Sequence, residues 1–186
     1  EFIKNDDRFL LIKQKENLGW VGNMNFVLSE AVKMGDYVFI STHDDVPDPG
    51  YIENMMQALH ENPDAVIAYG DIKWLKVVGE TNIVSYPEGH AIADNMKRLK
   101  TVLSKKWDYW VFYRGVIRAE AVKKILPLEK NIFGHKQYHS DWLWLVKIAH
   151  QGEMIRVPGV SFTKYNQPAS YSGTWAYTMK NYFGVL

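Results

Sequence analysis

Strand and helix patterns alternate regularly over residues 8–71, and this alternation constrains the fold more than any other feature of the sequence. Short runs rich in β-favouring apolar residues predict strands at residues 8–14, 37–41 and 65–69. Between them, apolar residues recur every three or four positions, which is the spacing of a helix with one buried face. Strands joined by helices in this way form right-handed crossovers, so we predict an α/β fold with a mostly parallel central sheet flanked by helices.

Each of the two helices in this region has clear end signals. Asn17 and Gly19 form a turn before the first helix, and Gly35 suits its C-terminal cap. The second helix, predicted over residues 50–61, begins next to Pro49, because proline is favoured at the first position of a helix. The predicted buried faces consist of Val21, Met24, Leu28 and Ala31 in the first helix and Ile52, Met55, Met56 and Leu59 in the second.

The pattern is less regular after residue 71. We predict a hairpin over residues 71–86 and an aromatic segment at residues 105–117 that passes through a strand. The tail after Pro158 is rich in Tyr, Ser and Gly, which favours a loop or lid. Further helices are predicted at residues 92–103, 119–125 and 141–151, the last with Trp144, Leu145, Ile148 and Ala149 facing inward.

The composition narrows the class of protein. A chain of 186 residues is long enough for one domain with a buried core. Its net charge of +1 does not suggest nucleic-acid binding, and the absence of cysteine excludes disulfides and fits a reducing compartment. No apolar run approaches the roughly 20 residues needed to cross a bilayer. We therefore expect a cytoplasmic protein without a transmembrane segment, with a peripheral position at the inner face of a membrane as an alternative.

Two adjacent carboxylates, Asp44 and Asp45, follow the predicted strand at residues 37–41. In open α/β sheets, ligands bind beyond the carboxyl ends of the strands. Carboxylates at this place can hold a hard divalent cation, Mg²⁺ or Mn²⁺, whose shell is completed by substrate phosphates. The alternative is that Asp45 and Asp48 only cap the helix that follows.

The same stretch resembles a known family. NLGWVGNMN followed by MGDYVFISTHDDVPDPGYIENMMQALHENPDAVIAYGD is similar to the family-two glycosyltransferases, which have the Rossmann-like GT-A fold. That family shows an Asn-x-Gly with a later Asn, a Gly-acid-Tyr strand ending in Asp-x-Asp-Asp, a Pro-x-Tyr helix and a strand ending in Tyr-Gly. The residues that match this pattern are Asn17, Gly19, Asn25, Gly35, Tyr37, Asp44, Asp45, Tyr51 and Gly70.

The resemblance implies a donor site around the two aspartates. Asp44 takes the position that contacts the metal and the diphosphate, and Asp45 is expected to support the donor site. Thr42 stands where the family has the first aspartate of the signature, so it offers the ribose a hydroxyl but no charge. Asn25 belongs to the same donor side, and His43 is a variant feature next to the pair.

The resemblance also implies a general base. The family places it in an acid-Asp pair at the start of a helix that ends in Gly, and HSDWLWLVKIAHQG has this form. Ser140 takes the acidic position and Asp141 the position of the base, which accepts the proton of the attacking hydroxyl. The alternative is that Ser140 or Asp141 only caps the helix. His139 is the next candidate for the base.

The acceptor side and the lid are less well marked. Aromatic residues make up 14% of the chain, with seven tryptophans, which suits either an aromatic core or a surface that stacks on sugars or bases. Arg118 could pair with a donor phosphate or with an acid such as Glu120. The candidates for stacking on an acceptor sugar are Trp107, Trp110 and Tyr113, and the candidates in the lid are Lys164 and Tyr171.

Together these features predict a metal-assisted, inverting glycosyltransferase that moves a sugar from a nucleotide-sugar donor to a saccharide, a lipid-linked or another hydroxyl acceptor. The alternatives are a folded but inactive glycosyltransferase-like fragment, a nucleotidyltransferase and a non-catalytic carbohydrate-binding module. The βαβ pattern opposes the module, since such modules are mostly β-sandwiches. The nucleotidyltransferase is opposed because the chain shows no glycine-rich, basic phosphate loop.

We expect a single domain over residues 1–186, with a donor and metal half at 1–71 and an acceptor half and lid at 72–186. The resemblance implies that about 80 residues carrying the first strands and the nucleotide-base contacts precede residue 8 in the family, counted as βαβ units. A sheet without those strands exposes an edge or an apolar face. We therefore expect that this chain alone binds nucleotide weakly and self-associates, for example as a homo-oligomer, or that it is one piece of a longer protein.

Overall fold

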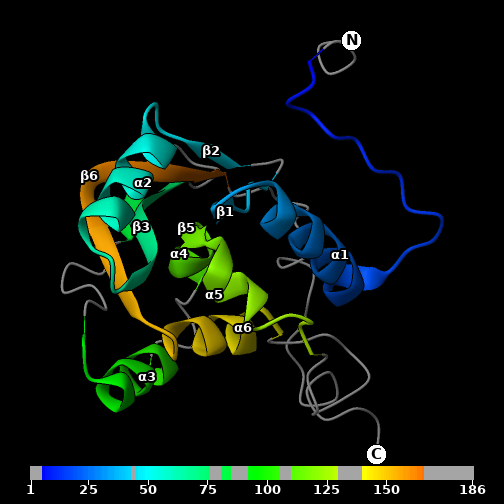
Figure 1. The fold of residues 1–186 in the computed structure, drawn as a ribbon. Coiled ribbons are helices and arrows are strands. Elements are labelled where there is room, and N and C mark those ends of the chain that lie inside the picture. Colours follow the sequence, from blue (N-terminus) through cyan, green and yellow to red (C-terminus); the bar gives the residue numbers. More distant parts are fainter. Residues whose placement is uncertain are drawn as a thin grey trace, which may run out of the picture.

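The computed structural model of the chain is an α/β fold in which helices pack on both faces of one curved sheet (Figure 1). It describes residues 6–42, 45–75, 81–84, 92–104, 110–129 and 140–165. The helices are α1 (Gly19–Met34), α2 (Tyr51–Glu61), α3 (Asn95–Ser104), α4 (Trp110–Tyr113), α5 (Ala119–Lys123) and α6 (Ser140–Ala149). The strands are β1 (Tyr37–Phe39), β2 (Asp45–Pro47), β3 (Ala65–Leu75), β4 (Thr81–Val84), β5 (Val116–Arg118) and β6 (Glu153–Tyr165).

The sheet is mixed, so the prediction of a mostly parallel sheet is wrong. Its strand order is β1-β5-β3-β6-β2, with β4 paired to β3, and β3–β6 is the one parallel pair between the described strands. β5 is antiparallel to both β1 and β3 and lies between them. β1 and β3 therefore run in the same direction, as their helical crossover requires. The sheet is mixed because β5, which comes later in the chain, lies antiparallel between β1 and β3.

The strand predicted at residues 8–14 is not formed. This segment has no regular secondary structure and swings outward before it enters α1 (Figure 1). Its apolar side chains are exposed to solvent, and Leu11 is 82% exposed. A strand needs a neighbour to receive its backbone hydrogen bonds, and no strand in the described part of the chain pairs with residues 8–14. The β-favouring sequence is present, but none of the described strands serves as its partner.

The tail after Pro158 is a strand up to Tyr165, so the prediction of a loop there is wrong. β6 pairs with β3 on both sides of a break in register, where β3 advances from Tyr69 to Asp71 while β6 advances from Arg156 to Ser161. The extra residues of β6 form a bulge that holds Pro158, which has no N–H to donate to the ladder. Tyr171 lies outside the described residues.

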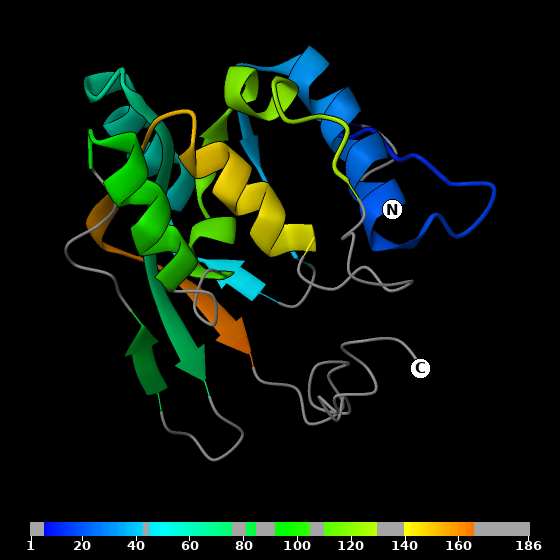
Figure 2. The same ribbon diagram turned by 90° about the horizontal axis from the view of Figure 1, so that it is seen from below.

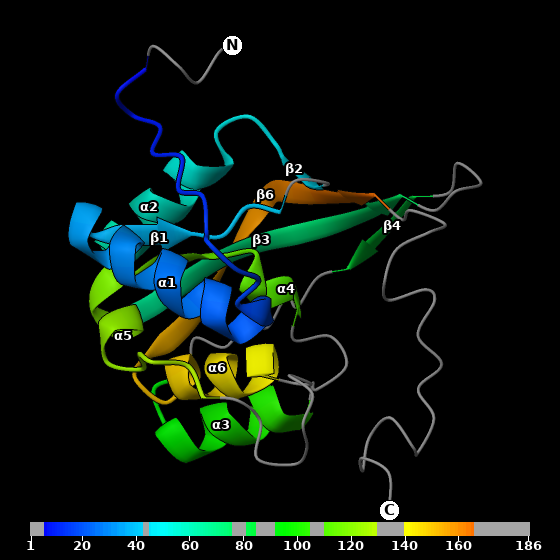
Figure 3. The same ribbon diagram turned by 90° about the vertical axis from the view of Figure 1, so that its right-hand side faces the viewer.

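The predicted helices are confirmed, and they form two layers around the sheet. α2 covers one face, whereas α6, with α3 beside it, lies on the opposite side (Figure 3). The view from below shows α1 and α5 packed together next to α6 (Figure 2). The predicted inward face of α6 is fully buried at Trp144, Leu145, Ile148 and Ala149. The hairpin is confirmed by the antiparallel pairing of β3 with β4, and the segment at 105–117 reaches its strand at β5.

Candidate functional site

The candidate site lies at the end of the sheet where β2, β6 and β3 meet (Figure 3). Asp45 begins β2 and is the register partner of Lys164 in β6. Lys164 is in turn the register partner of Trp74 in β3. Register partners point to the same face of a sheet, so the pairing brings an anion, a cation and an aromatic ring into one row. His43 and Asp44 lie outside the described residues.

The carboxylate of Asp45 is turned inward and buried. Its Oδ2 accepts hydrogen bonds from Arg114 Nη2 and from Thr42 Oγ1, each at 2.7 Å. The side chains of Asp45 and Arg114 are only 1% and 9% exposed, so the ion pair is removed from water. A buried charge is tolerated when it is paired and hydrogen-bonded. Asp45 therefore holds Thr42 and Arg114 in place, and it does so from inside the protein.

Arg114 is held from several sides. Its guanidinium carbon lies 5.3 Å from the ring centre of Tyr113 and 5.6 Å from that of Phe162, within the range of cation–π attraction. Its backbone carbonyl accepts a hydrogen bond from the hydroxyl of Tyr51 at 2.9 Å. The same hydroxyl accepts from the N–H of Gly70 at 3.1 Å. Both the side chain and the backbone of Arg114 are thus fixed.

Tyr51 and Gly70, two residues of the family pattern, support this site from below. Burial raises the pKa of Tyr51 to about 12, so its hydroxyl stays a neutral donor. Gly70 lies at the register break of β3, where its N–H turns to Tyr51. A Cβ on Gly70 would come within 2.5 Å of the Val160 oxygen and 2.8 Å of the Tyr51 ring. Only glycine leaves room for this close approach.

Asp141 lies near the same cluster, at the second residue of α6. Its Oδ1 accepts a hydrogen bond from the backbone N–H of Trp142 at 2.9 Å. Burial raises the pKa of Tyr113 to about 12; the charge of Arg114 opposes this rise, and the negative charge of Asp141 adds to it. The Tyr113 ring packs edge-on against Trp144 of α6 at 5.3 Å. Residues 113–114 therefore connect Trp144 of α6 to Asp45.

Two other predicted residues make contacts with the backbone. Asn25 Nδ2 donates to the Leu128 carbonyl at 3.0 Å, and Asn25 Oδ1 accepts from the Leu128 N–H, which ties α1 to the segment after α5. Arg118 donates to the carbonyl oxygens of Ala65 and Leu59 rather than to an acid. Its predicted partner Glu120 pairs with Lys123 instead.

The capping alternative for the aspartates at β2 is not what the structure shows. The N-cap of α2 is Gly50, and it has no side-chain hydrogen bond. Asp48 instead pairs with Lys73 at 2.9 Å and accepts the Ser161 N–H at 3.0 Å, which fastens the loop before α2 to β6. Asp45 is engaged with Arg114, as described above.

Arg114 is the site residue that the sequence reasoning missed. A signal was available, because a single cation interrupts the apolar run that surrounds it, YWVFYRGVI. A buried cation in such a run requires a buried anion as its partner.

The chemistry of the site fits a hard divalent cation only when substrate oxygens complete its shell. Within the described residues no group of three His, Asp or Glu side chains is placed to hold a metal. One carboxylate oxygen, Asp45 Oδ1, is buried and has no hydrogen-bond partner in the structure. Cations such as Mg²⁺ are often held by one or two carboxylates together with substrate phosphates.

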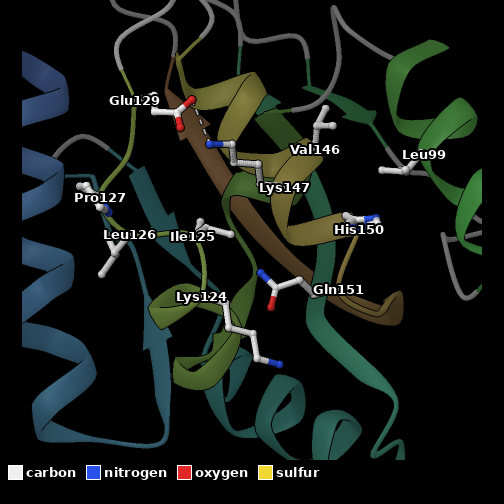
Figure 4. A pocket seen from close by; sticks show the side chains of 10 residues that line it. All are labelled: Leu99, Lys124, Ile125, Leu126, Pro127, Glu129, Val146, Lys147, His150 and Gln151. Carbon is white, nitrogen blue, oxygen red and sulfur yellow. Dashed lines mark ion pairs between the residues drawn. The ribbon is translucent and has the colours of Figure 1, made fainter.

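A cavity of about 630 Å³ lies elsewhere, along the last turns of α6 (Figure 4). Val146 and Leu126 contribute to its apolar wall, and the ion pair of Lys147 with Glu129, at 3.1 Å, lies at its rim. Asp141 lies at the opposite end of the same helix. None of the predicted site residues lines this cavity, so it is separate from the candidate site.

Comparison with known proteins identifies the family of the matched region. The family model described as Glycosyl transferase family 2 matches residues 1–125, which is more than half of the chain. The search of curated proteins found no match. Among the helices of the described residues, none is both long enough and apolar enough to cross a membrane.

Proposed function

The chain belongs to glycosyltransferase family 2, and from this premise we propose that it moves a sugar from a nucleotide-sugar donor to a hydroxyl of a saccharide or lipid-linked acceptor, with inversion. The proposal is supported mainly by the family match, which includes Thr42 and Asp45. Lys164 lies opposite Asp45 in the sheet, and Arg114 forms an ion pair with it. Members of this family are glycosyltransferases.

On the donor side, we assign the diphosphate to Asp44 and Lys164. Asp44 would hold Mg²⁺ or Mn²⁺, which when bound neutralises charge on the departing diphosphate. Lys164 adds a protein cation to the same leaving group, and it sits opposite Asp45 in the β2–β6 ladder. Thr42 offers a hydroxyl to the ribose, and Asp45 keeps that residue in place through its 2.7 Å hydrogen bond.

On the acceptor side, we assign the general base to Asp141. The acceptor oxygen attacks the anomeric carbon, the bond from that carbon to the diphosphate oxygen breaks, and the hydroxyl proton passes to the Asp141 carboxylate. The position of Asp141 at the start of α6, next to the Tyr113–Arg114 segment, supports this role.

Asp141→Asn tests the base. The amide is nearly isosteric, so folding and donor binding should persist while transfer falls by about 10²- to 10⁴-fold, the contribution typical of general-base catalysis. Asp94→Asn is a matched control, because Asp94 is also a carboxylate beside a helix start, where it accepts the Lys97 N–H. Near-parental transfer in Asp141→Asn would move the role to His139.

Asp44→Ala tests the metal site. Calorimetric titration with Mn²⁺ and either UDP or GDP should show weaker binding than in the parent protein, because the proposed metal ligand is lost. Equal affinity would remove Asp44 from the donor site. A screen of nucleotide-sugars for transfer and hydrolysis addresses the reaction itself, and an inactive glycosyltransferase-like fragment would give neither.

A further inference from the structure

The cavity of about 630 Å³ at the end of α6 has no part in the function proposed above (Figure 4). Its walls come from α3, from residues 124–129, which follow α5, and from the last turns of α6 with the two residues after that helix. All the residues that line it belong to the described part of the chain. Its volume lies within the range of about 300–1,000 Å³ that is typical of sites for small molecules.

The walls of this cavity are joined by hydrogen bonds near the end of α6. The buried side chain of Arg98 in α3 donates from Nε to the carbonyl oxygen of Ala149 at 2.5 Å. On the other side, Gln151 Nε2 donates to the carbonyl oxygen of Ala121 in α5 at 2.9 Å. These bonds fix α3 and α5 to the same end of α6. A ligand therefore enters a cavity that is already formed, and it spends little of its binding free energy on ordering the protein.

Apolar side chains from all three walls face the cavity. Leu99 of α3, Val146 of α6 and Leu126 line it and are only partly buried against the core, whereas Ile125 is fully buried in the wall behind them. A ligand chain that covers these side chains is removed from water together with them. Each CH₂ group buried in this way tightens binding by about fourfold.

The polar groups of the cavity carry more positive than negative charge. The titratable residues that line it are Lys124, Glu129, Lys147 and His150. Glu129 pairs with Lys147 at 3.1 Å, and Lys124 forms no ion pair with any described residue. The carboxylate of Glu120 is paired with Lys123, which is the main cause of its lowered pKa, and Lys124 adds a smaller share. Lys124 is therefore available to attract an anion.

We propose that this cavity binds a small amphiphilic anion, whose aliphatic chain covers Leu99, Leu126 and Val146 and whose carboxylate lies beside Lys124. Figure 4 shows Lys124 at one end of the apolar wall and Glu129 at the other. A carboxylate at Lys124 is thus kept away from the acidic residue of the cavity. The site is separate from the one assigned to glycosyl transfer, and it does not depend on that function.

The length of the ligand chain tests the apolar wall. In calorimetric titrations of the whole chain below the micelle concentration, dodecanoate should bind about 15-fold more tightly than decanoate, because it has two more CH₂ groups to bury. Leu99→Trp fills the cavity and should weaken the binding of dodecanoate by roughly 10-fold or more, since the ring takes the space of several CH₂ groups. Met96→Trp is the matched control, because Met96 lies on the same helix, is 61% exposed and does not line the cavity.

The charge of the ligand tests Lys124. Lys124→Gln should weaken the binding of dodecanoate by about 1.5- to 5-fold, as expected for a solvent-accessible ion pair. Lys123→Gln removes the same charge from the neighbouring position, which does not line the cavity, and should leave the affinity at the parental value. Dodecyltrimethylammonium, a cation with the same chain, should bind the parent protein more weakly than dodecanoate does.

Several results would overturn the proposal. The site is excluded if the parent does not bind dodecanoate, or if folded Leu99→Trp binds it as tightly as the parent; if that variant does not fold, Val146→Trp decides in its place. The anionic head group is excluded if dodecyltrimethylammonium binds equally well and Lys124→Gln has no effect. Phosphatidylglycerol vesicles distinguish a free amphiphile from a lipid surface. Co-sedimentation with these vesicles without binding of free dodecanoate would refute the small-molecule site.

Discussion

Tyr51→Phe removes one oxygen atom from beneath the site and provides the sharpest test of how the fold supports it. The hydroxyl of Tyr51 donates to the Arg114 carbonyl at 2.9 Å and accepts the Gly70 N–H at 3.1 Å. Tyr51 is 1% exposed, so water cannot replace the lost bonds without a rearrangement. Two buried backbone groups would be left without a partner.

The expected loss of stability follows from these two groups. A buried donor or acceptor left unpaired costs about 1–3 kcal/mol, so the loss of two partners should lower the free energy of unfolding by about 2–6 kcal/mol. For a chain of this size that lowers Tm by roughly 4–24 °C. Tyr113→Phe is the matched control, because Tyr113 is also buried but its hydroxyl donates to a weak acceptor, Met24 Sδ, at 3.8 Å.

Urea unfolding followed by circular dichroism measures both variants against the parent. Tyr113→Phe should change the free energy of unfolding by less than about 1 kcal/mol, as expected for one weak hydrogen bond. If both variants lower the free energy of unfolding by the same amount, the two hydrogen bonds of the Tyr51 hydroxyl, to Gly70 and to Arg114, do not stabilise the fold as proposed.

Three further perturbations have defined outcomes. Burial raises the pKa of Tyr51 and of Tyr113 from 10.0 to about 12 in the folded protein. As the pH rises, the unfolded chain therefore loses these protons before the folded protein does. The free energy of unfolding should be unaffected below pH 10 and should fall between pH 10 and 12 by about 1.4 kcal/mol per pKa unit for each tyrosine. Urea midpoints against pH measure this slope, which Tyr113→Phe should make shallower. Gly70→Ala should cost about 1–3 kcal/mol by overpacking, while Gly35→Ala, whose Cβ would meet only one atom at 3.8 Å, should cost less in the same assay. Leu11→Ser, at an 82% exposed position, should leave Tm unchanged and reduce the self-association measured by analytical ultracentrifugation. A monomeric parent protein would contradict the prediction of self-association.

The sequence predicts the helices well because each carries its own periodicity and end signals. α1 buries the predicted Val21, Met24 and Leu28. In α2 the prediction is only half right: Met55 and Leu59 are buried, whereas Ile52 and Met56 are 41% and 40% exposed. The strands are predicted less well, because whether a β-favouring segment forms a strand depends on a neighbour that the segment does not encode. Residues 8–14 have the sequence of a strand, but no strand in the described part of the chain pairs with them, whereas β6 continues past Pro158 because it pairs with β3.

The site is predictable in its residue types but not in its pairings. The sequence indicated that Asp45 and Lys164 belong to one site, and the β2–β6 register places them opposite each other. The sequence could not indicate that Asp45 forms an ion pair with Arg114, because that contact joins segments 69 positions apart. Similarly, the amide of Asn25 is occupied by the backbone of Leu128, a contact that depends on the packing of α1.

The insertion of β5 between β1 and β3 has a consequence for synthesis of the chain on the ribosome. No pair of described strands within the first 75 residues is hydrogen-bonded, since β1 pairs with β5, β2 pairs with β6, and β3 pairs with β4, β5 and β6. α1 and α2 can form early, but β1 can pair with β5 only after residues 116–118 are made, and β2 can pair with β6 only after residues 153–165 are made. Such long-range pairing is slow and leaves apolar strands exposed in the meantime. Chaperones that bind nascent chains would therefore meet this protein with its helices formed and its sheet incomplete.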